Sequence, residues 1–224
     1  MSVKVVIQCA ASKDPQAGHL TDGDGRPVLF VANPQKAPPS ATHRYARPDE
    51  PAGHGKNWRD VLIDYNDQAQ SNPLHLRPAY KLYSNPTYVL LVQRYGAENV
   101  FILSAGWGLI NAEYLTPLYD ITFSASAAPY KRRRKRDHYN DLCLLPTGSG
   151  DDLVFFGGKD YLPLFCDLTR DYNGRRFVFY NLAAEPLAPG CTLMRYPTTT
   201  RTNWHYSCAS AFMAGELRLS EPGA

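Results

Sequence analysis

The sequence predicts an α/β protein built on a mainly parallel central sheet of four to five strands, with helices on both faces. Short apolar runs recur along the chain, and segments with the spacing of amphipathic helices separate them. Hydrophobic residues make up 44% and charged residues 20% of the 224 residues, which are values typical of a globular domain. A chain of this length can close a sizeable core, so residues 1–224 are expected to form a single α/β domain.

Four apolar runs are predicted as buried strands, at residues 3–8, 100–103, 153–156 and 176–180. The predicted helices cover residues 57–70, 86–95, 160–168 and 203–217. The second of these helices has Pro86 in its first turn and Gly96 directly after its end. Residues 14–57 are rich in glycine, proline, histidine and aspartate, and only residues 28–31 form an apolar run. This segment is predicted to be a long irregular insertion.

Small or polar residues follow each of the four predicted strands. They are Cys9, Ser12 and Lys13 after the first strand, Ser104, Gly106, Trp107 and Gly108 after the second, Gly158 and Lys159 after the third, and Asn181 after the fourth. Open parallel sheets bind their ligands in the crevice beyond the carboxyl ends of the strands. We therefore expect these strand ends to converge on one site.

The sharpest local pattern is ILSAGWGLINAEYLTPLYD, and it places the predicted working site at residues 101–120. Gly106 and Gly108 allow a tight turn and a close approach of the backbone to a ligand. Trp107 between them is predicted to stack on a planar ring, a contact of roughly 1–3 kcal/mol per base. Tyr119 and Asp120 place an aromatic ring beside a carboxylate. The alternative is a structural turn in which Trp107 fills the core and Asp120 caps a helix or turn.

Residues 9–14, CAASKD, form a second candidate constellation. Ser12, Lys13 and backbone N–H groups can cradle a phosphate or a base edge. The alternative is a strand-to-loop turn whose small residues pack together. The spacing differs from that of a phosphate-binding P-loop, and the chain contains no GxGxxG. Nucleoside triphosphatases and dinucleotide-dependent enzymes are therefore disfavoured.

A run of six cations, KRRRKR, stands out against a formal net charge of only +3. Its members are Lys131, Arg132, Arg133, Arg134, Lys135 and Arg136. Such a run is usually a solvated face or a disordered arm. It is also a patch that would neutralise several phosphates, and it follows Asp120 closely along the chain. Contact with DNA is favoured over the solvated face.

The segment YPTTTRTNWH, residues 196–205, precedes and opens the last predicted helix. Arg201, Asn203 and His205 would stand at the start of that helix, where an anion is readily bound. The alternative is a capped helix whose Trp204 packs against the core. A single histidine is more often structural than catalytic. His205 is nevertheless kept as a candidate catalytic residue.

The five cysteines, Cys9, Cys143, Cys166, Cys191 and Cys208, are widely spaced and form no CxxC pair. This spacing disfavours a zinc ribbon, an iron–sulfur cluster and a disulfide framework. No metal site and no cofactor are predicted. The first residues do not have the pattern of an export signal, and no apolar run is long enough to span a bilayer. A cytoplasmic protein with reduced thiols is expected.

Four segments together resemble a family of small bacterial and phage proteins. They are CAASK (9–13), AYKLYSNPTY (79–88), FILSAGWGL (101–109) and TPLYD (116–120), which match a CxxSK first strand, an AxxLYS helix start and an ILSAxxGL…YD loop. Trp107 stands where that family often has tyrosine. The loop and FYNLAAEP (179–186) are also similar to YaaA-like peroxide-stress proteins and to the companion domain of archaeosine synthase. More distantly they resemble the uracil-DNA glycosylase superfamily, whose own two signature loops are not recognisable here.

The broad group includes a phage-defence DNA glycosylase that removes glucosylated hydroxymethylcytosine from phage DNA. The resemblance therefore implies a uracil-DNA-glycosylase-like sandwich and a hydrolase that cleaves an N-glycosidic bond in antiviral defence. Its partner would be DNA, with the modified cytosine flipped out of the stack into a pocket.

In such an enzyme a carboxylate stabilises the oxocarbenium-like state formed as the bond between C1′ and the base breaks. Asp120 is the first choice for that carboxylate and Asp14 the second. The predicted donors to the departing base are Ser12, Lys13, Asn181 and His205. Attack on C1′ by Lys13 or Lys159 would nick the strand as well.

Two other functions remain open. A nucleobase- or nucleotide-modifying transferase would use the same pocket and add mass to the nucleic acid. A non-catalytic nucleic-acid-binding module would bind in a salt-sensitive way and change no covalent bond.

Overall fold

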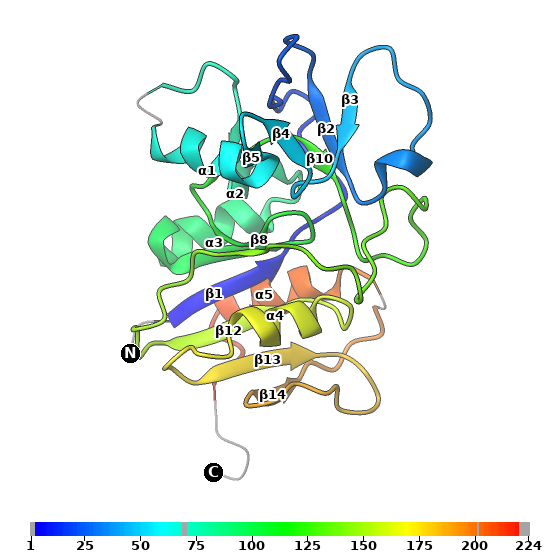
Figure 1. Cartoon of the computed structure of the whole chain (residues 1–224). Coiled ribbons are helices and arrows are strands. Elements are labelled where there is room, and N and C mark those ends of the chain that lie inside the picture. The colour runs from blue at the N-terminus through cyan, green and yellow to red at the C-terminus, as the bar shows by residue number, and fades with distance from the viewer. Residues whose placement is uncertain (1–2, 69–70, 201, 220–224) are drawn as a thin grey trace.

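The computed structural model describes residues 3–68, 71–200 and 202–219, and its centre is a seven-stranded sheet (Figure 1). The strand order is β11-β8-β7-β1-β12-β13-β14. Five neighbouring strands run parallel: β7 (Val100–Ser104), β1 (Val3–Gln8), β12 (Asp152–Phe156), β13 (Arg176–Tyr180) and β14 (Thr192–Arg195). At one edge β8 (Gly108–Asn111) is antiparallel to β7, and β11 (Leu142–Cys143) pairs with β8.

The α/β class and the mainly parallel sheet are confirmed, and the four predicted strands lie side by side in it. The sheet is larger than the predicted four to five strands because β8, β11 and β14 were not predicted. β11 has two residues and β14 is half-buried, so neither shows a continuous apolar run. β8 folds back from β7 over the turn at residues 105–107, within the loop that was assigned to the site.

The helices are α1 (Trp58–Asp67), α2 (Ala79–Leu82), α3 (Thr87–Tyr95), α4 (Leu162–Leu168) and α5 (Trp204–Met213), with short 3-10 turns η1 (Pro34–Lys36) and η2 (Ala97–Asn99). The four predicted helices correspond to α1, α3, α4 and α5, each somewhat shorter than expected. Asn57 and Asp60 form a capping box that fixes the start of α1. Gly96, with a φ of +83°, ends α3 as the sequence predicted.

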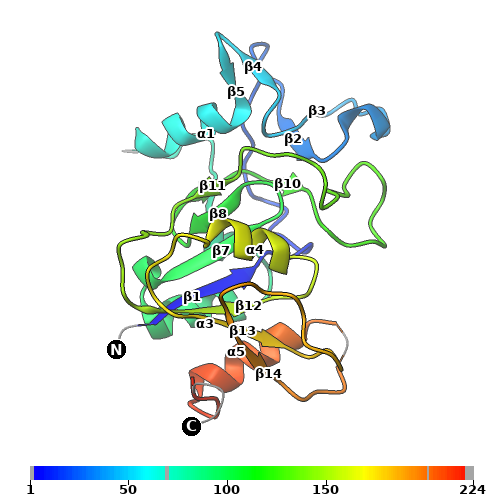
Figure 2. The same ribbon diagram turned by 60° about the horizontal axis from the view of Figure 1, so that its bottom comes forward.

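Helices cover both faces of the sheet (Figures 1 and 2). Phe155 and Phe156 are neighbours in β12 and therefore point to opposite faces. Phe155 stacks on Phe165 of α4, with ring centroids 4.5 Å apart. Phe156 packs against Phe212 of α5 at 5.5 Å, and Phe212 also stacks on Tyr95 of α3. Accordingly, α4 covers one face, and α3 and α5 cover the other.

The segment at residues 14–57 lies with α1 above the sheet in Figure 1. It is not irregular throughout, because it contains β2 (Val28–Val31), β3 (Arg44–Ala46), β4 (Pro51–Gly53) and β5 (Lys56–Asn57). β2 forms a small parallel sheet with β3 and with β10 (Tyr119–Asp120). A further pair, β6 (Arg77–Pro78) and β9 (Leu115–Thr116), joins neighbouring loops. Phe30 of β2 packs against Trp58 and Trp107, which ties this segment to the main core.

No helix among the described residues has the length and apolarity needed to cross a membrane.

Candidate functional site

A cavity of about 420 Å³ lies beyond the carboxyl ends of β1, β12 and β13, where α5 begins. We call it the strand-end cavity. Its walls come from segments far apart in the sequence: Gln8, Cys9, Ala10, Ala11, Thr122, Ser124, Ala125, Gly158, Lys159, Asp160, Tyr161, Asn181, Leu182, Thr202, Asn203, Trp204, His205 and Tyr206. Its position is the one expected for the ligand crevice of an open parallel sheet.

Neutral hydrogen-bonding groups dominate this lining. The Gln8 side-chain carbonyl accepts from the Gly158 N–H at 2.7 Å, which fixes the orientation of its amide. Asn181 offers a second amide and donates to the carbonyl of Thr200 at 3.2 Å. His205 is 3% exposed, and its Nε2 atom has no hydrogen-bond partner among the described residues. Burial lowers the pKa of His205 to about 4, so the imidazole is neutral at physiological pH.

Two phenols complete the polar lining. The hydroxyl of Tyr161 lies 3.2 Å from the Cys9 sulfur, and the hydroxyl of Tyr206 lies 3.2 Å from that of Tyr88. Burial raises the pKa of Tyr161 and of Tyr206, so both remain protonated and able to donate. Cys9 is itself buried and also accepts from the Ala105 N–H at 3.4 Å.

A second cavity of about 560 Å³ adjoins the first and shares Ala11, Thr122 and Ser124 with it. We call it the Lys13 groove. The Lys13 ammonium nitrogen lies 4.3 Å from the centroid of the Tyr119 ring. Asp120 also lines the groove, where it forms an ion pair with Lys131. Burial lowers the pKa of Lys13, and the positive charge of Lys131 adds to that effect, while Cys9 and Asp120 oppose it.

The loop that follows β7 is a structural element and not an open ligand loop. Trp107 is fully buried between Phe30 and Tyr119, which corrects the prediction that it stacks on a base. The Ser104 hydroxyl donates to the Tyr119 hydroxyl at 2.8 Å and accepts from the Gly106 and Trp107 N–H groups. Ser104, Gly106 and Trp107 therefore serve the core, as the structural alternative had it for Trp107, whereas Asp120 caps none of the described helices but pairs with Lys131 at a cavity.

The glycines of this loop are required by packing. A Cβ on Gly106 would lie 3.2 Å from the Tyr119 ring. Gly108 has a φ of +92°, and a Cβ there would lie 2.3 Å from the carbonyl oxygen of Leu142 in β11. Of the described residues in the predicted working segment, Leu118, Tyr119 and Asp120 at its end line the Lys13 groove.

Ser12 and Asp14 lie outside the linings of both cavities. The Ser12 hydroxyl donates to the Ser84 hydroxyl at 3.1 Å. The Asp14 carboxylate accepts from the Gln16 N–H and from Arg77, and these contacts hold its pKa below the usual range. Their predicted catalytic roles are therefore not supported by position.

The cationic run divides into an engaged part and an exposed part. Arg133 is buried, pairs with Asp141, and donates to the Ala105 carbonyl at 2.9 Å. Lys131 pairs with Asp120. Arg132, Arg134, Lys135 and Arg136 are exposed. The expectation that all six cations contact DNA is corrected for the buried Arg133, and Lys131 and Lys135 are also paired with carboxylates, Asp120 and Asp160.

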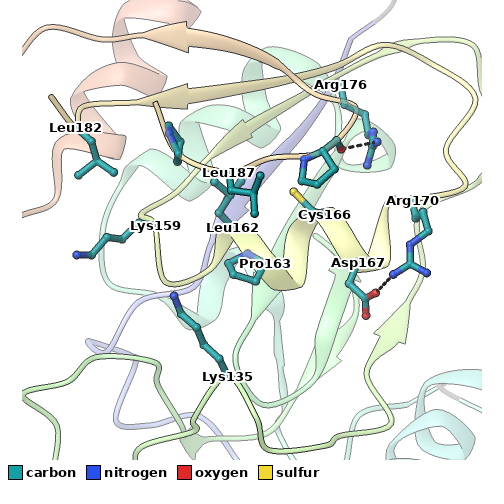
Figure 3. Close-up of a pocket in the computed structure, with 12 residues that line it drawn as sticks. Lys135, Lys159, Leu162, Pro163, Cys166, Asp167, Arg170, Arg176, Leu182 and Leu187 are labelled. Atoms are coloured by element: carbon teal, nitrogen blue, oxygen red, sulfur yellow. Dashed lines mark hydrogen bonds and ion pairs between the residues drawn. The ribbon is translucent and has the colours of Figure 1, made fainter. Parts of the chain in front are cut away.

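A third cavity, of about 600 Å³, lies on the outer side of α4 (Figure 3). Leu162, Pro163 and Cys166 of α4 form one wall, and the loop carrying Leu187 forms another. Charged side chains stand at its rim, among them Lys135, Lys159 and the Arg170–Asp167 ion pair. This cavity is mainly apolar and contains none of the amides or imidazoles described above, so it is not the candidate site.

The structure brings together in the strand-end cavity six residues that the sequence predicted: Cys9, Gly158, Lys159, Asn181, Asn203 and His205. Arg201 lies outside the described residues. Sequence reasoning missed Gln8, Asp160, Tyr161 and Tyr206. Gln8 and Asp160 directly adjoin motifs that were recognised, and Tyr161 follows one residue later, so a wider window around each strand end would have included them.

The comparisons with known proteins add no relative: no family model, no curated protein and no solved structure matches this chain.

Proposed function

We propose that this protein is a DNA glycosylase that excises a modified base, with glucosylated hydroxymethylcytosine as the preferred candidate, in defence against phage. The proposal includes kinship with the uracil-DNA-glycosylase-like sandwich folds. The observation that carries it is the neutral, hydrogen-bonding lining of the strand-end cavity.

The lining fits a nucleobase better than a phosphate. A base is planar and uncharged, and it presents donors and acceptors along its edges. The amides of Gln8 and Asn181, the imidazole of His205 and the nearby phenols offer both kinds of partner without a net charge. A phosphate site would instead be lined by several cations or by clustered N–H groups.

The Lys13 groove is large enough to hold the sugar or a substituent attached to the base. It meets the strand-end cavity along Ala11, Thr122 and Ser124, so a base in the cavity would direct its deoxyribose or a bulky substituent toward the groove. The combined space exceeds what an unmodified pyrimidine needs, and this favours a base that carries a large hydrophilic group.

Two of the exposed cations are tied to residues that line this site. Arg132 forms a backbone bridge with Thr122, which lines both cavities. Lys135 pairs at 3.6 Å with Asp160, which lines the strand-end cavity. DNA phosphates held by Arg132, Arg134 and Arg136 would therefore lie close to the point where a flipped base enters.

In the proposed reaction the bond between C1′ and the base breaks through an oxocarbenium-like state, and water adds to C1′. Asp120 is the carboxylate assigned to stabilise that state, since it faces the groove into which the sugar would extend. Asn181 and the neutral His205 are assigned to hydrogen-bond the departing base, where charge develops. Asp160 is the other carboxylate in the two linings and is the alternative to Asp120.

The test uses three duplexes of equal length that contain unmodified cytosine, uracil or glucosylated hydroxymethylcytosine. After incubation with the protein, alkali-labile sites are counted on gels and released bases are identified by mass spectrometry. We expect abasic sites in the glucosylated duplex alone. No abasic site in any duplex at high protein concentration would contradict the proposal. Added mass on the DNA would indicate a transferase, and binding without covalent change would indicate a binding module.

Variants then assign the carboxylate. Asp120→Asn is expected to slow base release by about 100-fold or more. Asp64→Asn is the matched control, because Asp64 lies on the surface of α1 and pairs with Lys56 far from either lining. A large loss in Asp160→Asn with full activity in Asp120→Asn would transfer the role to Asp160.

A further inference from the structure

Lys13 occupies an unusual place for a lysine. It lies in the loop that follows β1 and lines the Lys13 groove, two residues after Ala11, which lines both cavities. Its amine lies over the face of the Tyr119 ring and 3.5 Å from the carbonyl oxygen of Ala11. Tyr119 is in turn fixed by hydrogen bonds to the hydroxyls of Ser104 and Tyr83. The amine is thus held against a rigid wall instead of extending into solvent.

Burial has the largest effect on the pKa of this amine and outweighs the neighbouring charges. Asp120, which acts on Lys13, is already neutralised by its ion pair with Lys131. Burial lowers the pKa of Lys13 against the opposing effects of Cys9 and Asp120, and Lys131 adds to the lowering, so a larger share of the amine is unprotonated than in an exposed lysine. A desolvated lysine beside a second cation is a recognised arrangement for imine formation with a carbonyl compound.

We propose that Lys13 forms an imine with the C1′ aldehyde of an abasic deoxyribose, and that the protein therefore also nicks the strand from which it removes a base. This inference rests on the proposed function for its substrate, an abasic site in DNA. It adds a second activity, β-elimination at the product of the first.

The chemistry balances without a further reactant. The Lys13 nitrogen adds to the aldehyde carbon of the ring-opened sugar, and the resulting carbinolamine loses water to give the imine. Loss of a proton from C2′ then expels the 3′ phosphate, which takes up the negative charge as the strand breaks. Water hydrolyses the unsaturated imine and returns the free Lys13 amine. Asp120, the carboxylate beside Lys13, is placed to receive the C2′ proton.

Two other lysines near the site are less suited to this role. Lys131 is held by its ion pair with Asp120. Lys159 lines the strand-end cavity but is exposed, and it stands at the rim shared with the cavity on α4. The structure therefore selects Lys13 from the two lysines that the sequence left open.

The experiment starts from DNA that already contains an abasic site, prepared chemically or with an unrelated enzyme. The full-length protein is incubated with this duplex and with borohydride, which reduces an imine to a stable amine. We expect a covalent protein–DNA adduct, and peptide mass spectrometry should locate it on Lys13. Without borohydride the strand should be cut at the abasic site.

Two variants distinguish imine formation at Lys13 from imine formation at other lysines. Lys13→Arg keeps the positive charge and should lose the adduct and the nicking. Lys36→Arg, an identical change at an exposed position in η1, should retain both. An adduct of undiminished yield in Lys13→Arg, an adduct mapped only to another residue, or no adduct in the unaltered protein would overturn the inference. Because the abasic site is supplied, failure here leaves the proposed base excision standing, and nicking without base excision would refute only the latter.

Discussion

At the scale of single residues, the buried imidazole of His205 makes the free energy of unfolding depend on pH. Its ring is buried, and its pKa is lowered to about 4 because burial disfavours the charged form. The unfolded chain therefore binds more protons than the folded one between about pH 4 and 6.5, so the stability falls as the pH is lowered through this window. The full shift corresponds to about 3 kcal/mol.

We expect the free energy of unfolding of the unaltered protein to fall between pH 7 and pH 4 by about 3 kcal/mol more than that of His205→Gln. Urea titrations at a series of pH values measure this difference. His138→Gln, a change at an exposed histidine, is the matched control and should follow the unaltered protein. Parallel pH profiles for His205→Gln and the unaltered protein would show that the imidazole is not buried in its neutral form.

Single residues were also where the sequence was least informative. Trp107 between two glycines predicted an exposed stacking ring, yet its burial is decided by Phe30 and Arg59, which come from distant segments. His205 was located correctly at the start of the last helix, but nothing in the sequence reveals that its Nε2 lacks a partner. The place of a residue in a strand, helix or turn follows from the local sequence pattern. Whether its side chain is exposed depends on packing with segments far away in the sequence.

At the scale of one element, the cationic run contains both a structural arginine and surface arginines. Arg133 forms a two-fold hydrogen-bonded pair with Asp141, donates to the turn after β7, and lies 3.9 Å from the centroid of the Tyr139 ring. Removing it would leave the Asp141 carboxylate buried without its charge partner. We expect Arg133→Met to lower the free energy of unfolding by roughly 3–5 kcal/mol.

Arg134→Met is the matched control, because Arg134 is the exposed neighbour in the same run. It should change the free energy of unfolding by no more than about 0.5 kcal/mol. Denaturant titrations of the two variants decide the point. Equal stabilities would mean that the pair between Arg133 and Asp141 does not organise this segment.

Elements with strong local signals were predicted, and those defined by pairing were not. Local sequence patterns are enough to predict the apolar strands β1, β7, β12 and β13. The same holds for the helices α1 and α3. β11 consists of two residues that pair with β8, a contact that no local pattern contains. The short strands at residues 28–57 were missed for the same reason, apart from the apolar run of β2.

At the scale of the whole molecule, the proposed binding to DNA is expected to depend on the exposed cations of the run at residues 131–136. We expect Arg134→Gln and Arg136→Gln each to make the slope of the logarithm of the binding constant against the logarithm of salt concentration shallower by about 0.9. Fluorescence anisotropy with a labelled duplex measures the slope. Arg94→Gln, an exposed change on α3, should leave it unaltered. Unchanged salt-dependence slopes for both Arg134→Gln and Arg136→Gln would show that these two arginines do not contact DNA phosphates.

The cavity at the strand ends lies where the sheet topology predicted a candidate site. Parallel strands place their carboxyl ends together, and β1, β12 and β13 do so around the strand-end cavity. What could not be predicted is which strand end stays buried. The end of β7 is covered by its own hairpin with β8, so the segment at residues 101–120 contributes only its last residues, Leu118, Tyr119 and Asp120, to the two cavities.

The walls of the strand-end cavity have a consequence for how the protein is made. Gln8 and Cys9 come from the first strand, and His205 and Tyr206 come from the last helix. A chain still held by the ribosome has no complete cavity until α5 has emerged, because one wall is missing before then. For the base excision proposed above, this means that the nascent chain would have no activity before α5 has emerged.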